Sequence, residues 1–420
     1  MTRIGYIPYV ANRNSVEAEW LAEAFACNVE VLRDGPTLNL ESCARLPGFQ
    51  RVGDALESVL QQSSVVVEGP GGFLWGALLR AHGFQGMVTI LPYLNPRRWY
   101  DVACVALYRR FADRQDRIFL GSTPSARIYR GLGVDARVGE PYGIDRRVFH
   151  MKANSEAVVS TLGITKGRIL LFAGRVHPDK DLYCLLRVGL RAQLLFSDLQ
   201  IVIASHVVDE AYMAILRKAT TSSNIHWVLN PTRDQLADLY NIADVFVTAA
   251  ISHFETFGRA LAEALACGTP VIAPRYDGFM EVLAQPGGKL VDVEITETGP
   301  RVNEELLLRA IFDALSTTTP IPSDIISATA LSRFDRSNTI QLLSHVTSEG
   351  PFEARRAENT EISIALPPAW TDSLRQMDSL PSSKLLSWFW NTDDHERLRD
   401  HDPEFVATIR LRLCDCSHLP

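Results

Sequence analysis

Short apolar runs alternate along this chain with longer stretches in which apolar positions recur every three or four residues. The first pattern predicts buried β-strands and the second predicts amphipathic helices. In the first half, the predicted strands are Thr2–Val10, Asn28–Leu32, Ser64–Glu68, Met87–Leu91, Arg117–Gly121 and Ala136–Gly139. In the second half, they are Arg168–Gly174, Leu199–Ser205, Ile225–Leu229, Ala243–Ala249, Pro270–Ala273 and Gly288–Val291.

Regular alternation of the two patterns is typical of parallel sheets joined by crossover helices. A chain of 420 residues is longer than one hydrophobic core usually serves, so we expect two domains. We predict an α/β protein with Rossmann-like domains over residues 1–150 and 166–320, facing each other across a cleft that holds the site. A helical region over 323–348 and an extension over 350–420 follow. Trp370, Trp388 and Trp390 favour packing of this extension on the body.

The segment His253–Ala273 carries the most informative pattern. Glu255 and Glu263 lie eight positions apart, before and within a predicted helix whose apolar face includes Phe257 and Leu261. Free N–H groups at a helix start suit an anion, whereas the two carboxylates suit neutral hydroxyl groups. This combination suggests a sugar nucleotide. Taken alone, each glutamate is also compatible with a structural role, with Glu255 or Thr256 as a helix N-cap and Glu263 as a solvated side chain.

A second motif, Leu170–Asp181, lies about 80 residues earlier. Its apolar strand ends in Gly174, and Arg175 and Lys180 follow around a turn. Two cations at the carboxyl end of a strand suit a diphosphate group. The alternative for this motif on its own is a solvated turn of Arg175 and Lys180 in which Asp179 is a helix N-cap.

The two segments together resemble the E-x7-E signature of retaining glycosyltransferases with the GT-B fold, the family 4-like "glycosyl transferases group 1". The resemblance extends over about Arg3–Ser348 and is most specific over Leu170–Leu290. Tyr142–Phe149 (YGIDRRVF) is similar to the segment that leads out of the first domain in this family. The resemblance implies a GT-B fold and transfer of a hexose-type sugar from a nucleotide-diphosphate sugar to an acceptor hydroxyl.

The resemblance also implies a role for each matching residue. Glu255 would bind the hydroxyls of the transferred sugar, Glu263 those of the ribose, and Arg175 and Lys180 the diphosphate. The family has a glycine where this chain has Asp181, which leaves the path of that loop open. The remaining donor-binding candidates are Thr256, Phe257 and Gly258 through their amides, Gly174 at the strand end, and Val228, Leu229 and Arg233 near the nucleobase. Since the two cations and the helix end can neutralise the leaving diphosphate, we expect no metal or other cofactor.

The first domain should bind the acceptor. After the strand Ser64–Glu68, a loop with Gly69, Gly71 and Gly72 would let a ligand approach the backbone. Many relatives carry a histidine near this strand end or the next, but this chain has Glu68 and Tyr93 in that neighbourhood. The first loop, Pro8–Asn12, also lacks the double glycine common in the family. The acceptor, whether a small molecule, a glycan or a lipid-linked sugar, is left open.

Composition narrows the class of protein. A net charge of −7 argues against nucleic acid as a partner. The N-terminal residues lack the apolar core of a signal peptide and no uncharged run is long enough for a transmembrane segment, so the expected location is the cytoplasm, with peripheral membrane attachment as an option. Seven scattered cysteines predict reduced thiols, and no carboxylate, histidine or cysteine cluster has metal-ligand spacing.

Two other functions share this pattern. One is a GT-B isomerase or phosphorylase, and the other is a non-catalytic subunit that binds sugar nucleotides. The intact Glu255, Glu263, Arg175 and Lys180 favour an active transferase, whereas the unusual first domain and the long extension favour a non-catalytic subunit.

Overall fold

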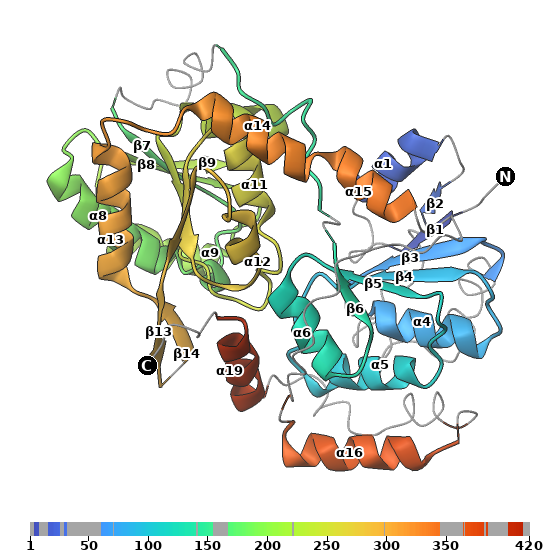
Figure 1. Cartoon of the computed structure of the whole chain (residues 1–420). Coiled ribbons are helices and arrows are strands. Elements are labelled where there is room, and N and C mark those ends of the chain that lie inside the picture. Colours follow the sequence, from blue (N-terminus) through green and yellow to red (C-terminus); the bar gives the residue numbers. More distant parts are fainter. Residues whose placement is uncertain are drawn as a thin grey trace. The chain divides into compact units, whose positions relative to one another are not determined.

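The structure is a computed structural model (Figure 1). It describes residues 4–7, 16–25, 29–31, 60–69, 71–139, 142–153, 167–220, 222–297, 299–344, 364, 366–381, 384 and 402–414. These residues form two compact α/β units. The first unit draws on residues 1–141 and 337–412, and the second unit on 142–336 and 413–420.

A six-stranded parallel sheet forms the centre of the second unit (Figure 1). Its strands are β7 (Ile169–Ala173), β8 (Gln200–Ser205), β9 (Ile225–Leu229), β10 (Val245–Val247), β11 (Val271–Pro274) and β12 (Gly288–Val291). Their order is β12-β11-β10-β7-β8-β9, so the strand order reverses between β7 and β10. Both faces of β7 and β8 are buried, which explains why their sequences are apolar without alternation.

Helices surround this sheet. They are the 3-10 turn η1 (Pro178–Lys180), α8 (Leu182–Leu195), α9 (Glu210–Ala219), α10 (Arg233–Ile242), α11 (Arg259–Ala266), α12 (Asp277–Val282), α13 (Glu304–Ser316) and α14 (Ser323–Phe334). α8 packs against α13, whereas α11 packs against α10 and α14 (Figure 1). An antiparallel hairpin of β13 (Val293–Thr296) and β14 (Gly299–Val302) follows β12 and was not among the predicted strands.

The first unit has a second six-stranded parallel sheet, ordered β2-β1-β3-β4-β5-β6. Its strands are β1 (Ile4–Ile7), β2 (Val29–Val31), β3 (Ser64–Glu68), β4 (Met87–Leu91), β5 (Arg117–Leu120) and β6 (Ala136–Val138). Its helices are α1 (Val16–Phe25), α4 (Gly72–Ala81), α5 (Trp99–Arg109), α6 (Thr123–Gly131), α15 (Arg336–Ser344), α16 (Pro368–Ser379) and α19 (Pro403–Arg412). Two parallel sheets with crossover helices confirm the predicted α/β class, and each predicted strand has a counterpart, although several are shorter at one end.

Two connecting segments differ from their predicted assignment. Residues 142–150, which the sequence analysis placed in the first domain, pack with the second unit. There the N–H of Ile144 donates to the carbonyl of Phe334 (2.8 Å), and the ring of Phe149 lies 6.0 Å from that of Tyr240. The predicted helical region over 323–348 contains two helices, α14 and α15, which meet at Asp335.

The helices of the extension among the described residues pack on the first unit, in agreement with the predicted packing of this tail on the body. α16 contacts α5, and α19 contacts α6. Trp370 of α16 packs on Phe405 of α19 with ring centroids 4.7 Å apart, and Met377 is fully buried. Trp388 and Trp390 lie outside the described residues.

Candidate functional site

Both predicted motifs follow strands at the point where the strand order of the second sheet reverses. The segment from Gly174 to Asp181 follows β7, and the segment from Thr248 to Gly258 follows β10. β7 and β10 are hydrogen-bonded neighbours and parallel, so both segments leave the sheet at the same edge. In open α/β sheets, ligands bind outside the carboxyl ends of the strands at such a reversal.

The loop after β7 keeps the shape that a glycine would give it. Asp181 has φ 44° and ψ 46°, in the left-handed region that asparagine and aspartate tolerate better than other side chains. Its carboxylate accepts a hydrogen bond from the N–H of Cys184 at 3.3 Å and so caps α8. The question raised by the missing glycine therefore has an answer, because Asp181 adopts the backbone conformation and adds a helix cap.

Asp179 organises the cationic side of this loop. One of its carboxylate oxygens accepts from the guanidinium of Arg175 at 2.5 Å, and the other lies 2.5 Å from Nδ1 of His177. The Arg175 guanidinium also lies 5.0 Å from the ring centre of Phe254, in the loop after β10. Arg175 is thus held between the two loops, and its side chain is about one-third exposed (36%).

Lys180 joins the two motifs directly. Its ammonium group donates a hydrogen bond to Oε1 of Glu255. Both side chains are largely buried, with 17% of Lys180 and 7% of Glu255 exposed. Burying a charge is costly unless the charge is paired, so each of these groups stabilises the buried position of the other.

A tight turn connects Glu255 to α11. Gly258 has φ 101°, and a Cβ atom there would lie 2.9 Å from the ring of Phe279, so the position requires glycine. α11 therefore starts at Arg259, and Phe257 lies before the helix, not on its apolar face as predicted. Phe257 instead stacks on Tyr142, with ring centroids 5.3 Å apart.

The amides of this turn are suited to an anion. Within the described part of the chain, no group accepts a hydrogen bond from the backbone N–H of Phe257 or Gly258. Both precede the first turn of α11, where the helix dipole favours negative charge. Thr256, the third predicted residue here, is buried.

Glu263 lies in a polar pocket on α11. Its Oε2 accepts a hydrogen bond at 3.2 Å from the hydroxyl of Tyr240, a fully buried residue of α10. Burial raises the pKa of Glu263 from 4.5 to about 7, although the positive charges of Arg259 and Arg233 and the Tyr240 hydroxyl oppose this shift. Glu263 thus differs from an ordinary solvated glutamate, since it is partly buried and hydrogen-bonded to Tyr240.

The three residues predicted near the nucleobase lie in two different places. Arg233, the first residue of α10, lies near Glu263 and packs over Phe149 at 5.5 Å from its ring centre. Val228 and Leu229 are on β9, the edge strand separated from β7 by β8. The predicted site residues thus gather around β7, β10 and α11, except for these two.

Tyr240 was not among the predicted residues, and Asp179 was considered only as a helix N-cap, a position that His177 and Asp181 occupy instead. Asp179 follows Arg175 at a spacing of four and could have been recognised as its partner within the motif. Tyr240 lies on a different helix from Glu263, and no local pattern in the sequence signals this pairing.

The first unit also has a carboxylate at the carboxyl end of one of its strands. Glu68, the last residue of β3, accepts hydrogen bonds on Oε1 from the hydroxyls of Tyr6 (2.5 Å) and Tyr93 (3.2 Å). Tyr93 has a left-handed φ of 61°, which is unfavourable for an aromatic residue. The predicted loop Pro8–Asn12 lies outside the described residues.

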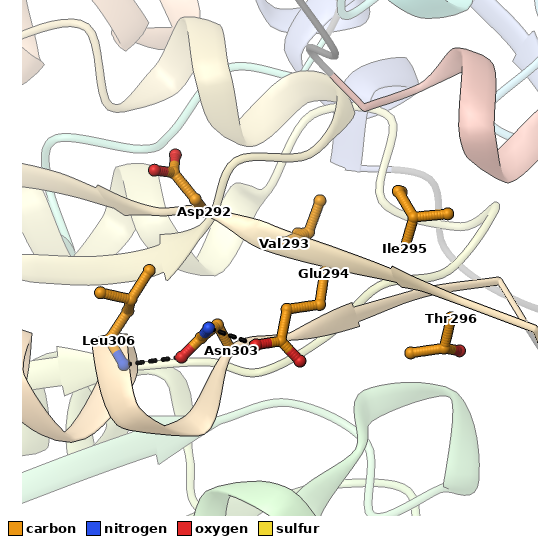
Figure 2. A pocket seen from close by; sticks show the side chains of 7 residues that line it. All are labelled: Asp292, Val293, Glu294, Ile295, Thr296, Asn303 and Leu306. Carbon is orange, nitrogen blue, oxygen red and sulfur yellow. Dashed lines mark hydrogen bonds between the residues drawn. The ribbon is translucent and has the colours of Figure 1, made fainter. Parts of the chain in front are cut away.

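A surface groove on the hairpin is a separate feature. Figure 2 shows the Asn303 side chain between Glu294 and the backbone N–H of Leu306, which donates to it at 2.9 Å. The groove is lined by Asp292, Val293, Glu294, Ile295, Thr296, Asn303 and Leu306. None of the predicted site residues contributes to it.

No helix of the described residues is long and apolar enough to cross a membrane. Their His, Cys, Asp and Glu side chains form no group of three or more that could hold a metal ion. The side chains of Cys104, Cys184, Cys267 and Cys414 are buried and in the reduced, thiol form.

Sequence comparisons find matches to part of the second unit. Residues 156–297 match the family model described as "Glycosyl transferases group 1". An alpha-maltose-1-phosphate synthase of Mycobacterium tuberculosis is 29% identical over 140 residues, which are 31% of this chain and 35% of that protein. A D-inositol 3-phosphate glycosyltransferase of Segniliparus rotundus is 32% identical over 132 residues, 30% of this chain and 29% of that protein. The match thus spans about a third of the length of these relatives.

Structural comparisons extend the likeness to most of the chain. The structure of Anabaena Alr3699/HepE in complex with UDP and glucose matches with a TM-score of 0.66 and 16% identity, covering 83% of this chain and all of that one (100%). A glycosyltransferase from Rickettsia africae matches with a TM-score of 0.63 and 13% identity, covering 83% and 99%. The chain has the GT-B fold with two Rossmann-like units, and its residues 156–297 match the model of the glycosyl transferases group 1 family.

Proposed function

We propose that this chain is a retaining glycosyltransferase that moves a hexose-type sugar from a nucleotide-diphosphate sugar to an acceptor hydroxyl. The observation that carries the proposal is the Lys180–Glu255 pair at the strand-order reversal. It joins a cation suited to phosphate with a carboxylate suited to sugar hydroxyls, in a domain of a glycosyltransferase family.

The diphosphate is assigned to the cationic loop and the turn before α11. Arg175 and Lys180 supply fixed positive charge, and the N–H groups of Phe257 and Gly258 supply donors. These groups would stabilise the charge that develops on the departing diphosphate without a metal ion. Gly174 permits this loop to lie close to its own strand, because a Cβ there would come within 2.9 Å of Phe172.

The hydroxyl groups of the donor are assigned to the two glutamates. Glu255 would accept hydrogen bonds from the transferred sugar, and Glu263 from the ribose. Burial raises the pKa of Glu263, and the charges of Arg259 and Arg233 and the Tyr240 hydroxyl oppose this rise, so these residues would act on ribose binding through that carboxylate.

The reaction needs no enzyme nucleophile. The acceptor oxygen bonds to the anomeric carbon on the face that the diphosphate leaves, the bond from that carbon to the phosphate oxygen breaks, and the acceptor proton passes to the leaving phosphate. In the first unit, Glu68 is our candidate for binding an acceptor hydroxyl, because two tyrosines orient its carboxylate at the sheet edge.

A panel of nucleotides tests the proposal. Since a solved structure with this fold holds UDP and glucose, the panel starts with UDP and UDP-glucose and continues with GDP and ADP and their hexoses. Saturating concentrations of the right nucleoside diphosphate should raise the unfolding temperature by mass action, and the sugar nucleotide should be turned over. Binding without turnover under any acceptor would indicate a non-catalytic subunit. Turnover that requires inorganic phosphate would indicate a phosphorylase.

A further inference from the structure

The last described residues of the chain lie on the second unit, beside the turn between β11 and α12. The carbonyl of Leu413 accepts a hydrogen bond from the N–H of Asp277 at 2.9 Å. Cys414 forms an antiparallel bridge with Tyr276. Leu413 is fully buried. The far end of the chain thus completes a turn in the domain that carries the glutamate motif.

This turn is in direct contact with the Glu255 loop. The N–H of Gly278 donates to the carbonyl of Glu255 at 3.4 Å. A Cβ atom on Gly278 would lie 2.5 Å from Cα of Phe257 and 2.6 Å from the carbonyl carbon of Thr256. Backbone therefore packs on backbone without an intervening side chain, and a shift of the turn has to move the loop.

The turn also needs support. Asp277 is fully buried and has φ 39°, a left-handed conformation that is unfavourable for a residue with a side chain. Its N–H is satisfied by the Leu413 carbonyl. Without that acceptor, a buried donor would lose its partner in a strained turn, and the turn would be expected to relax.

We propose that Leu413 and Cys414 are positioning residues for the donor site, holding the Glu255 loop through Tyr276, Asp277 and Gly278. They touch neither substrate nor reacting atoms in this account. The functional part of the inference rests on the proposed transferase activity, whereas the structural part does not.

The test compares two shortened chains. One ends after Arg412 and lacks both residues, and the control ends after Cys416 and keeps them. Hydrogen exchange followed by mass spectrometry should show faster exchange over residues 252–258 in the first chain than in the control. With the sugar nucleotide that the full chain turns over, the rate at saturating donor should fall roughly tenfold or more, as expected when reacting groups are misplaced. The affinity for UDP should also fall, because the amides of Phe257 and Gly258, which we assign to the diphosphate, lie in the same segment.

If the shortened chain does not fold, a point variant provides a second test. Leu413→Ala removes buried side-chain atoms but keeps the carbonyl, and should speed exchange over 252–258 to a smaller extent, with Leu413→Met close to the full chain. Unchanged exchange over 252–258 in both the chain that ends after Arg412 and Leu413→Ala would overturn the proposal, whatever the activity. Faster exchange with an unchanged rate at saturating donor would also overturn it. A full chain that binds and turns over no nucleotide sugar would instead contradict the proposed function, and the exchange data would still decide the structural role.

Discussion

Lys180 donates a hydrogen bond to Glu255 across 75 positions of sequence, and this contact connects the loops after β7 and β10. The pair has two consequences for ligand binding. Without a ligand, each charge neutralises the other in a largely buried site. In the proposed donor complex, Lys180 would gain a more strongly charged partner in the diphosphate, and Glu255 would become able to accept hydrogen bonds from sugar hydroxyls.

Removal of either loop cation should weaken nucleotide binding. Lys180→Ala and Arg175→Ala each remove a charge-assisted contact to the diphosphate, at a cost of roughly 1.5–3 kcal/mol in binding free energy. Lys180→Ala should also lower the unfolding temperature, because Glu255 stays buried without its partner. Titration calorimetry with the nucleoside diphosphate measures the first effect. Arg191→Ala is the matched control, since Arg191 pairs with Glu305 on the surface of α8. Affinities equal to that control in both variants would exclude the diphosphate role.

Nucleotide affinity should depend on the ionisation of Glu263. Its pKa of about 7, raised by burial, means that the group is mostly protonated at pH 6 and mostly ionised at pH 8. Only the ionised form accepts hydrogen bonds from both ribose hydroxyls, so affinity should rise with pH, by up to about tenfold per unit below the pKa. Because the phosphate also titrates, the measured quantity is the difference between the unmodified chain and Glu263→Gln. Parallel pH profiles for the two proteins would show that Glu263 does not contact the ribose.

The same group should affect stability with the opposite sign. A carboxyl group with a raised pKa in the folded state stabilises the fold below its unfolded pKa, near 4.5, and this contribution is lost as pH rises through about 7. The free energy of unfolding should therefore decline relative to Glu263→Gln between about pH 5 and pH 7. Denaturant titrations at several pH values measure this. A constant difference between the two proteins would contradict the raised pKa.

Transfer should continue in excess chelator. In the proposed site, Arg175, Lys180 and the amides before α11 would provide the positive charge that a divalent cation would otherwise supply. The measurement is the transfer rate before and after dialysis against EDTA. Activity that disappears with EDTA and returns with magnesium or manganese would show that a metal ion is required.

Glu68→Gln should weaken binding of the acceptor and leave binding of the donor unchanged. With a sugar acceptor identified from a panel of monosaccharides and polyols, we expect KM for that acceptor to rise several-fold, since one hydrogen bond to a charged group is weakened. Hydrolysis of the same sugar nucleotide by water, and affinity for the nucleoside diphosphate, should not change. If nucleotide affinity falls and acceptor KM stays constant, Glu68 has no acceptor role.

The strands, the fold and the main motif residues could be predicted because their signals are local. Runs such as that of β7 are apolar because both faces are buried, and Arg175 and Lys180 follow that strand in sequence. The Lys180–Glu255 and Tyr240–Glu263 contacts could not be predicted, because they depend on strand order and helix packing. The same holds for the return of Leu413 to Asp277.

Some local expectations were also incomplete. The helix start was predicted too early because the apolar spacing of Phe257 fits a helix, whereas the left-handed Gly258 delays its start to Arg259. The hairpin β13–β14 was missed because its strands are four residues each, partly exposed and not strongly apolar. Asp181 shows the reverse case, in which an unexpected residue preserves the expected backbone.

The central claim is that Glu255 binds the transferred sugar and Glu263 the ribose, and substitution of each glutamate tests it most directly. The measurement is the transfer rate and the nucleoside-diphosphate affinity of Glu255→Gln and Glu263→Gln, each checked for folding by thermal melting. We predict that Glu255→Gln lowers the transfer rate with little change in nucleoside-diphosphate affinity, because that ligand has no hexose. Glu263→Gln should weaken binding of both the sugar nucleotide and the nucleoside diphosphate, because both contain ribose. If both variants fold and keep the kinetics and affinity of the unmodified chain, this donor site is contradicted.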